Sequence, residues 1–288
     1  MKLVTFTVDG TTKIGAVKNE GVIDLAKVDS ALAIDMLALL EGGDELMSLA
    51  KKAAASGEVH YRLRDVKLEA PVLKPGKILA IGMNYAKHAD EARKLGVTVP
   101  DKQLWFNKQT TCVNGPYDGI DLPKVSDKLD YEAELALVIG KRCRHVSVED
   151  ASSVIAGYMI CNDVSVRDWQ MHTTTFTMGK SFDTHGPMGP CLVTADEIED
   201  PHTLDLKCFV NGELRQSSNT SDLIANCYDQ IAYLSAAFTL EPGDILVTGT
   251  PSGVGIAMNP PQFLKLGDVV RCEVEKLGFI ENTVVAEK

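Results

Sequence analysis

From residue 78 onward the chain reads as a series of short strand-forming segments separated by Gly, Pro, Asn and Asp. Asn211-Gly212 lies between two such segments, which is typical of a tight hairpin. Only a few helical patterns interrupt the series, near residues 84–96, 147–154 and 221–237. We therefore expect a mostly antiparallel sandwich or barrel-like roll, and we exclude a parallel doubly wound sheet, in which strands and helices would alternate.

The first 72 residues have a different texture. Three strand-like segments within 2–25 are followed by two amphipathic helical patterns, "AIDMLALLE" and "DELMSLAKKAAAS", and the second ends at Gly57. The Pro and Gly of "LKPGK" at 73–77 mark a boundary. With 288 residues, about two domains are expected. The sequence predicts an α+β, mostly β fold, with a small α+β domain at 1–72 and the main domain at 73–288.

Charge and apolar content exclude several classes of function. The chain has 29 Lys and Arg against 40 Asp and Glu, and a net charge of -11 is the wrong sign for binding nucleic acid. The N-terminal apolar segment is too short for a signal peptide, and no apolar run approaches the ~18 residues that span a bilayer. We expect a cytoplasmic protein that binds neither nucleic acid nor membrane.

Seven scattered cysteines include no C-x-x-C pair, and their total is odd. This pattern argues against both a disulfide framework and a zinc cluster. We expect reduced cysteines that serve as small core residues.

The segment "LDYEAELALVIG" at 129–140 places two acids in an otherwise apolar strand. Glu132 and Glu134 share a face, with Cα atoms roughly 6 to 7 Å apart. Asp163 ends the apolar strand "GYMICND" and would meet them if the two strands are neighbours. Three carboxylates without His or Cys suit a hard cation such as Mg²⁺, which Mn²⁺ or Ca²⁺ could replace. In the alternative interpretation, the two glutamates line the solvated face of an edge strand and Asp163 begins a turn.

A second constellation follows a strand near residue 82. Asn84 is expected to cap a helix on which His88 and Glu91 stand three residues apart, hence on one face. Glu91 could accept a hydrogen bond from one imidazole nitrogen and leave the other to act as a general base. The alternative is an ordinary pair on a surface helix.

Cationic and Gly-rich segments form the third group. Arg167, Gln170 and Lys180 follow Asp163 closely, and a Gly-flanked lysine could bind a carboxylate or an oxyanion, although most lysines lie in solvent. In "ILVTGTPSGVG" at 245–255 a strand runs into a Gly-rich loop. The loop lacks both nucleotide-binding spacings, so we exclude a nucleotide site.

Together and in order, these segments resemble the fumarylacetoacetate hydrolase family, in the branch that contains acylpyruvate hydrolases, hydroxymuconate-type isomerases and oxaloacetate decarboxylases. The resemblance runs from about 70 to 285 and rests on "GMNYAKHADE", "DYEAELALVIGK", "NDVSVRD", "GKSFDT", "VNGELRQSSNTSDLI" and "EPGDILVTGTPSGVG". It implies a mixed β-roll, usually a homodimer, and a small N-terminal domain is typical of this branch. It also implies a mobile lid over the site.

The resemblance implies roles for nine residues of this chain. These are Glu132, Glu134 and Asp163 as ligands of Mg²⁺, His88, Glu91 and Lys180 as catalytic residues, and Arg167, Gln170 and Thr250 as residues that face the substrate. The chain departs from the family pattern after "KSFDT", where His185-Gly186 replaces an expected aromatic residue, and after "NTSDLI", where "ANCYD" does so. We expect His185 to lie in a surface turn, and the alternative is a second titrating group at the site.

The main functional hypothesis is a Mg²⁺-dependent hydrolase that cleaves a C–C bond in a small β-diketone or an acylpyruvate-type keto acid. In it, His88 removes a proton from water, and the metal with Lys180 stabilises the enolate that leaves. Two alternatives use the same apparatus: an isomerase or tautomerase, and a decarboxylase, acting on a hydroxy-dienoate or on oxaloacetate. An alternative of another class is a non-catalytic protein that binds a metal or a small molecule.

Overall fold

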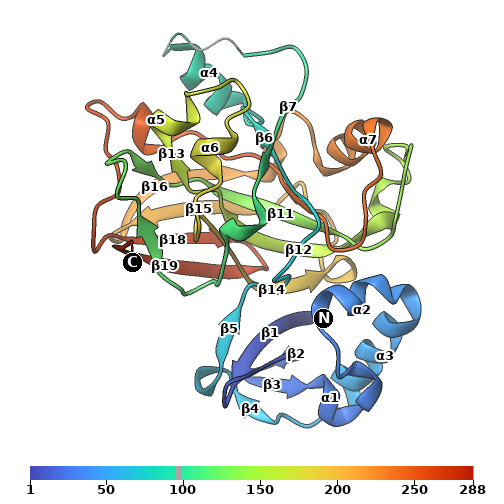
Figure 1. The fold of residues 1–288 in the computed structure, drawn as a ribbon. Coiled ribbons are helices and arrows are strands. Elements are labelled where there is room, and N and C mark those ends of the chain that lie inside the picture. The colour runs from blue at the N-terminus through green and yellow to red at the C-terminus, as the bar shows by residue number, and fades with distance from the viewer. Residues whose placement is uncertain (95, 97–98, 288) are drawn as a thin grey trace.

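The computed structural model describes residues 1–94, 96 and 99–287. Most of its strands join one large mixed sheet (Figure 1). The order is β4 (Tyr61–Arg62), β3 (Gly21–Asp24), β2 (Thr11–Lys18), β1 (Lys2–Val8), β14 (Gly186–Thr194), β12 (Ile155–Asn162), β11 (Ala133–Ile139), β17 (Ile245–Val247), β6 (Ile78–Gly82) and β7 (Leu104–Lys108). Along this path only β17 and β6 pair in parallel. The predicted α+β, mostly β fold is confirmed.

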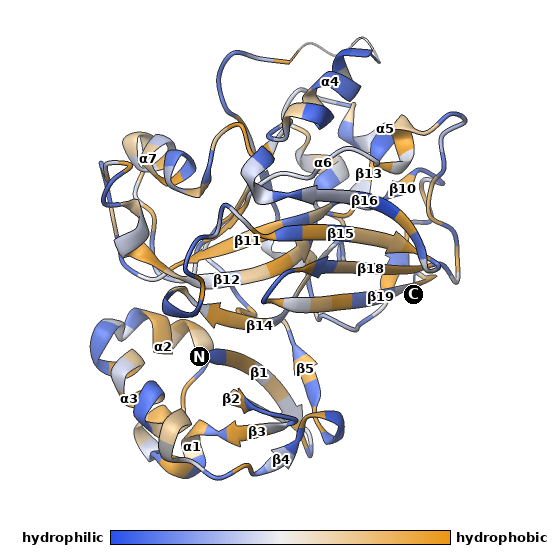
Figure 2. Ribbon diagram, turned by 180° about the vertical axis from the view of Figure 1, so that it is seen from behind, coloured by the Kyte–Doolittle hydropathy of each residue, from blue (hydrophilic) through white to orange (hydrophobic). Residues whose placement is uncertain are grey.

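A second sheet covers one face of β11 and β12. It contains, in order, β16 (Glu213–Asn219), β15 (Asp205–Val210), β18 (Val269–Val274), β19 (Gly278–Ala286) and β9 (Ile120–Leu122). The predicted hairpin between β15 and β16 turns at Asn211 and Gly212, which both have positive φ, 52° and 80°. Figure 2 shows apolar residues along the stacked strands of the two sheets, whereas α4 (Ala86–Lys94) is largely hydrophilic.

The central strand β11 is buried over its whole length because neighbouring strands flank it and apolar clusters cover both faces. Leu135 and Leu137 belong to the core between the two sheets. Ala136 and Val138 belong to a second core. Side chains alternate along a strand, so Glu134 shares the face of Ala136 and Val138. It lies near the start of β11, opposite Cys161 of β12.

The N-terminal segment extends the large sheet. Its strands β1 to β3 are followed by the helices α1 (Leu25–Val28), α2 (Met36–Glu41) and α3 (Gly43–Ser56). β1 pairs with β14 through Lys2 opposite Val193 and Leu3 opposite Leu192. In Figure 1 this segment, in blue, lies below the rest of the molecule. Its status as a separate domain ending at residue 72 stays a prediction.

Three short helices gather at the end of the molecule opposite the N-terminal strands (Figure 1). They are α4, α5 (Arg167–Gln170) and α6 (Thr177–Lys180). The helix predicted near 84–96 is α4, and Leu95 lies outside the described residues. The helix predicted at 147–154 is wrong, because residues 148–150 form a turn and only 151–154 are helical, as a short 3₁₀ helix.

The helix predicted at 221–237 begins later, as α7 (Cys227–Ala237). Asn226 and Asp229 form a capping box there, and this fixes the first helical residue. The remaining short strands are β5 (Lys67–Glu69), β8 (Val113–Asn114), β10 (Leu129–Asp130) and β13 (Ser165–Val166). β10 pairs with β13, which brings Asp130 opposite Ser165.

All seven cysteines are buried and free, as expected for reduced core residues. Among the described helices, none is long and apolar enough to cross a bilayer.

Candidate active site

Three acids meet where two neighbouring strands end. Glu134 lies in β11, Glu132 comes just before it, and Asp163 follows β12. The antiparallel register sets Ala133 opposite Asn162, and the Asp163 N–H donates to the Glu132 carbonyl at 2.8 Å. As a result, one carboxylate oxygen from each acid lies within 4.8 Å of the others. The structure therefore brings the predicted acids together, and all three are buried rather than on a solvated edge.

Cationic side chains surround two of these acids. Lys180 Nζ lies 2.7 Å from Glu132 Oε2 and 2.8 Å from Asp163 Oδ2. Lys108 Nζ lies 2.7 Å from Asp163 Oδ1, and Arg167 Nη1 lies 2.6 Å from Glu132 Oε1. Burial by itself would raise the pKa of Glu132, but Lys180 and Arg167 outweigh it and lower that pKa to about 2. Glu132 is therefore ionised at neutral pH.

Glu134 has the opposite electrostatic environment. Its Oε2 accepts a hydrogen bond from the Gly249 N–H, and no ion pair to it occurs within residues 1–94, 96 and 99–287. Burial, together with the nearby charges of Asp163 and Glu132, raises its pKa well above the ordinary value. A cation between the three acids would relieve this repulsion, and oxygen donors of this kind suit a hard divalent ion. The residues fit a divalent cation by this criterion.

His88 and Glu91 form the pair that their spacing predicts. They lie one turn apart on α4, with His88 Nδ1 3.0 Å from Glu91 Oε2. The other oxygen of Glu91 lies 3.4 Å from the backbone nitrogen of Gly253. When the Nδ1–H group donates a hydrogen bond to Glu91, the free lone pair of the neutral imidazole is on Nε2.

Asn84 does not act as the predicted helix cap. Its side-chain amide donates to the carbonyls of Ala225 and Thr248 at 2.9 and 2.8 Å. Its oxygen accepts from the Ala225 N–H at 2.8 Å. Three long-range hydrogen bonds therefore use this side chain, which ties the start of the α4 segment to two distant loops.

A cavity of about 140 Å³ collects most of the predicted residues. Its polar lining consists of His88, Glu91, Glu132, Arg167, Gln170, Lys180 and Thr250. Its apolar lining consists of Ile81, Gly82, Met83, Phe106, Met171, Phe176, Val254, Ile256 and Ala257. Glu134 and Asp163 are buried and do not line the cavity. Of the three acids, Glu132 alone lines the cavity, together with the His88–Glu91 pair.

Two of the residues predicted to face the substrate, Arg167 and Gln170, line this cavity. The Arg167 guanidinium is buried, and its Nη1 also contacts Gln170 Oε1 at 3.0 Å. Its Nη2 has no hydrogen-bond partner among the residues that the structure describes. Thr250 also lines the cavity, but its hydroxyl donates to the Ala133 carbonyl at 2.9 Å and accepts from Gln216 at 2.8 Å. Thr250 therefore holds its own loop.

Sequence reasoning missed two charged residues of the site, Lys108 and Asp130. Each is fully or almost fully buried, Lys108 against Asp163 and Asp130 against Arg167. Burial would lower the pKa of Lys108, but Asp163 outweighs it, so the pKa is raised and the ammonium stays charged. The available signal was a charge inside an apolar strand pattern, in "LWFNK" and in "LDYE".

His185 is not in a surface turn, so that expectation is wrong. The residue is fully buried just before β14, and its Nε2 lies 2.8 Å from the Asp121 carbonyl oxygen. Burial lowers the pKa of His185 to about 4. The imidazole is therefore neutral at physiological pH.

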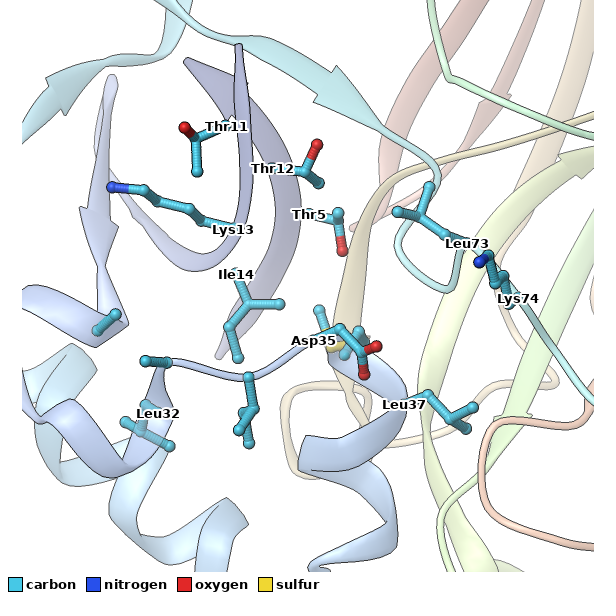
Figure 3. Close-up of a pocket in the computed structure, with 14 residues that line it drawn as sticks. Thr5, Thr11, Thr12, Lys13, Ile14, Leu32, Asp35, Leu37, Leu73 and Lys74 are labelled. Carbon is cyan, nitrogen blue, oxygen red and sulfur yellow. The ribbon is translucent and has the colours of Figure 1, made fainter. Parts of the chain in front are cut away.

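A larger cavity, of about 610 Å³, lies in the N-terminal segment (Figure 3). Its lining includes Thr5, Lys13, Leu32, Asp35 and Leu73. The ammonium of Lys13 pairs with Asp24 at 2.9 Å, and Asp35 accepts a hydrogen bond from the Ala38 N–H at the start of α2. Lys13 and Asp35 thus serve local structure, and among the described residues no group of three acids lies at this cavity.

Comparisons with known proteins identify the family of this chain. Residues 77–285 match the family model described as fumarylacetoacetate (FAA) hydrolase C-terminal. The mitochondrial oxaloacetate tautomerase Fahd2a of Rattus norvegicus is 46% identical over 266 residues, which cover 92% of this chain and 84% of that protein.

Two solved structures cover both chains completely. The fumarylacetoacetate hydrolase of Exiguobacterium antarcticum is 34% identical, with a TM-score of 0.85. The maleylpyruvate hydrolase of Sphingobium sp. SYK-6, in complex with manganese(II) and pyruvate, is 33% identical, with a TM-score of 0.83. The chain therefore belongs to the fumarylacetoacetate hydrolase family and is an enzyme.

Proposed function

We propose that this enzyme interconverts the keto and enol forms of oxaloacetate, with a divalent cation held by Glu132, Glu134 and Asp163. The observation that carries the proposal is the 46% identity to an oxaloacetate tautomerase over 92% of the chain. This favours the tautomerase alternative over C–C bond hydrolysis, the main hypothesis from the sequence. The non-catalytic alternative is set aside because the family consists of enzymes.

The size of the cavity supports a small substrate. A cavity of roughly 150 Å³ holds a molecule the size of benzene. The cavity of about 140 Å³ beside His88 therefore suits a four-carbon diacid better than a long acylpyruvate. Its cationic lining, Arg167 and Lys180, suits a dianion.

The proposed reaction needs one base that takes a proton and returns it. His88 Nε2 takes a proton from C3 of oxaloacetate, the C–H electron pair forms the C2–C3 double bond, and the C2 oxygen receives the negative charge. The imidazolium, held by Glu91, then gives the proton to that oxygen, so no atom is gained or lost. A cation bound to the three acids would supply Lewis-acid polarisation of the 2-oxo group. Lys180 adds positive charge at the same wall, and Arg167 binds a carboxylate.

The decisive measurement is the rate at which enol-oxaloacetate equilibrates with the keto form, followed by the ultraviolet absorbance of the enol. NMR on the same samples identifies any cleavage product or CO₂ release. We expect the enzyme to speed up this equilibration relative to buffer alone, and we expect NMR to show no cleavage of oxaloacetate. Cleavage of acylpyruvates at a higher kcat/KM, with no effect on the enol, would replace this proposal by the hydrolase hypothesis.

Hydrolysis is kept as the second candidate because of one specific observation. A hydrolase with 33% identity over the whole chain holds manganese(II) and pyruvate. In that reaction His88 would take its proton from water instead of from carbon. Magnesium as the metal, a homodimer and a cytoplasmic location stay predictions, and the rat relative is mitochondrial.

His88→Ala tests the base directly. We expect turnover to fall by about 10² to 10⁴-fold, the range for loss of a general base. His145→Ala, which removes an exposed imidazole on a distant turn, is the matched control and should keep full activity. Full turnover in His88→Ala would remove this residue from the mechanism.

A further inference from the structure

Asp130 is a buried carboxylate that stands outside the group of three acids. It ends β10, is fully buried, and accepts four hydrogen bonds. The donors are Tyr131 N at 2.9 Å, Arg167 Nε at 2.8 Å, Gly255 N at 2.8 Å and Ile256 N at 3.0 Å. One side chain thus joins α5 to the Gly-rich loop that follows β17.

The loop approaches Asp130 more closely than a larger residue would allow. A Cβ atom added at Gly255 would lie 2.7 Å from Asp130 Oδ1 and 2.1 Å from the Gln262 carbonyl oxygen. Only glycine therefore allows this approach. The flanking residues Val254 and Ile256 line the cavity, so the position of Asp130 sets one wall of it.

The same loop reaches the His88–Glu91 pair. Gly253 N lies 3.4 Å from Glu91 Oε1, and the Gly253 carbonyl accepts from the Tyr131 hydroxyl at 3.0 Å. Asp130 and its neighbour Tyr131 therefore hold both ends of the segment 253–256. This segment is the physical link between Asp130 and α4.

On its other side Asp130 fixes the guanidinium of Arg167. With Nε bound to Asp130 and Nη1 bound to Glu132 and Gln170, the plane of the guanidinium is set. The nitrogen left over is Nη2, which is buried and without a partner among the described residues. It is the donor that a carboxylate of a bound ligand can use.

We propose that Asp130 is a positioning residue, which holds Arg167 and the loop 253–256 in one fixed arrangement. A carboxylate bound at Arg167 then lies at a set distance from the imidazole of His88. The proposal rests on the proposed function only in that the ligand is a small 2-oxo carboxylate. Asp130 touches neither the ligand nor the reacting atoms.

A carboxylate is needed because both oxygens accept hydrogen bonds. In Asp130→Asn the new NH₂ group faces two donors: Arg167 Nε and Ile256 N if it replaces Oδ2, or Tyr131 N and Gly255 N if it replaces Oδ1. The variant therefore breaks the arrangement while its volume is unchanged. A hydrogen bond to a charged group corresponds to roughly 10- to 100-fold in binding.

The test is a double-mutant cycle on Asp130→Asn and Arg167→Gln. Binding of pyruvate in the presence of Mn²⁺ is measured by calorimetry, and thermal melting checks that each variant is folded. We expect each single variant to bind pyruvate roughly 10- to 100-fold more weakly. The double variant should bind no more weakly than Arg167→Gln, because Asp130 acts through Arg167.

Asp244→Asn is the matched control, since Asp244 is also fully buried and forms an ion pair, with Lys77 at 2.7 Å. Asp244 comes just before β17, whereas the loop that Asp130 holds comes after it. It should lose stability without losing affinity for pyruvate. If Asp130→Asn does not fold, Arg167→Lys removes the hydrogen bond between Arg167 Nε and Asp130 by changing its donor. This variant should lose as much affinity for pyruvate as Arg167→Gln.

Three results would overturn the proposal. They are wild-type affinity in Asp130→Asn or Arg167→Lys, losses that multiply in the double variant, and no binding of pyruvate by the unmodified protein. A protein that binds pyruvate but leaves the enol of oxaloacetate unchanged would instead refute the proposed function, and the cycle would still decide the role of Asp130.

Discussion

Two of the cavities in the described part of this molecule differ in both volume and the charge of their lining. The cavity in the N-terminal segment is about 610 Å³, and the one beside His88 is about 140 Å³. In the larger, Lys13 is neutralised by Asp24 and Asp35 holds the start of a helix. In the smaller, buried charges converge without complete pairing. The comparison teaches that unbalanced buried charge, and not volume, distinguishes the candidate active site.

The difference follows from the strands that build each cavity. The N-terminal cavity is lined by β1, β2 and the turns before α2, where polar side chains are exposed or satisfied locally. The smaller cavity lies near the ends of central strands, where an acid such as Glu134 is buried away from solvent. Removing a carboxylate from water is costly unless a cation compensates. Acids buried on central strands are therefore poorly solvated, and this favours the binding of a compensating cation.

The largest expected effect comes from removing one acid at the smaller cavity. Glu134→Gln keeps the shape but removes a ligand charge, and we expect turnover to fall by about 10³-fold or more, because a metal supplies several kcal/mol. Chelation by EDTA should have the same effect on the wild type, with Mg²⁺ or Mn²⁺ restoring activity. Steady-state rates and Mn²⁺ titrations measure both effects.

Asp35→Asn is the matched change at the larger cavity. Asparagine caps helices as well as aspartate does, so turnover and stability should both stay near wild type. A large loss of turnover in Asp35→Asn, or a chelator-resistant wild type, would break the comparison.

The second prediction is a change at the larger cavity that lowers stability and leaves activity unchanged. Leu32 lines the larger cavity and is fully buried. Leu32→Ala should lower the free energy of unfolding by about 2 to 5 kcal/mol, because it removes buried apolar contacts. Urea denaturation measures this loss, and kcat/KM below the transition should equal that of the wild type. A matching fall in kcat/KM would mean that the N-terminal segment contributes to the chemistry.

The sequence predicted those features of the site that follow from local backbone geometry. Alternation placed Glu132 and Glu134 on one face, and the end of an apolar strand placed Asp163 near them, because antiparallel neighbours bring such ends together. The spacing of His88 and Glu91 predicted their hydrogen bond, since three residues make nearly one helical turn. These inferences depend only on backbone geometry.

Other residues could not be placed, because burial is a tertiary property. Lys108 and Asp130 look like ordinary charges in the sequence, and only strand pairing puts them beside Asp163 and Arg167. For the same reason His185 looked like a turn residue and is instead fully buried. Asn84 could cap a helix locally, but its partners lie more than a hundred residues away, at Ala225 and Thr248.

The third prediction concerns the stability of the metal-free protein. Because burial and two neighbouring acids raise the pKa of Glu134, the folded state binds a proton that the unfolded state does not above pH ~4.5. This contribution to stability is present at low pH and is lost as pH rises through the raised pKa. Glu134→Gln should therefore stabilise the metal-free protein at pH 7, by roughly 1 to 4 kcal/mol.

Urea denaturation of chelated samples between pH 5 and 8 tests this prediction. As the pH falls, the free energy of unfolding of the wild type should rise relative to that of the Glu134→Gln variant. Added Mn²⁺ should strongly stabilise the wild type but not the variant. Equal stability of the two proteins across this range would show that Glu134 is ionised in the metal-free fold.

The smallest expected effect lies at the surface contact between the two regions. Lys51 of α3 pairs with Asp196, just after β14, at 2.8 Å, but both side chains are about half exposed. Such pairs contribute less than about 1 kcal/mol and weaken with salt. The N-terminal segment is held instead by the pairing of β1 with β14 and by buried residues such as Leu3. Lys51→Ala should therefore shift the urea midpoint only slightly at low salt and not at all at high salt. A loss as large as that of Leu32→Ala would mean that surface charge, and not strand pairing, joins the two regions.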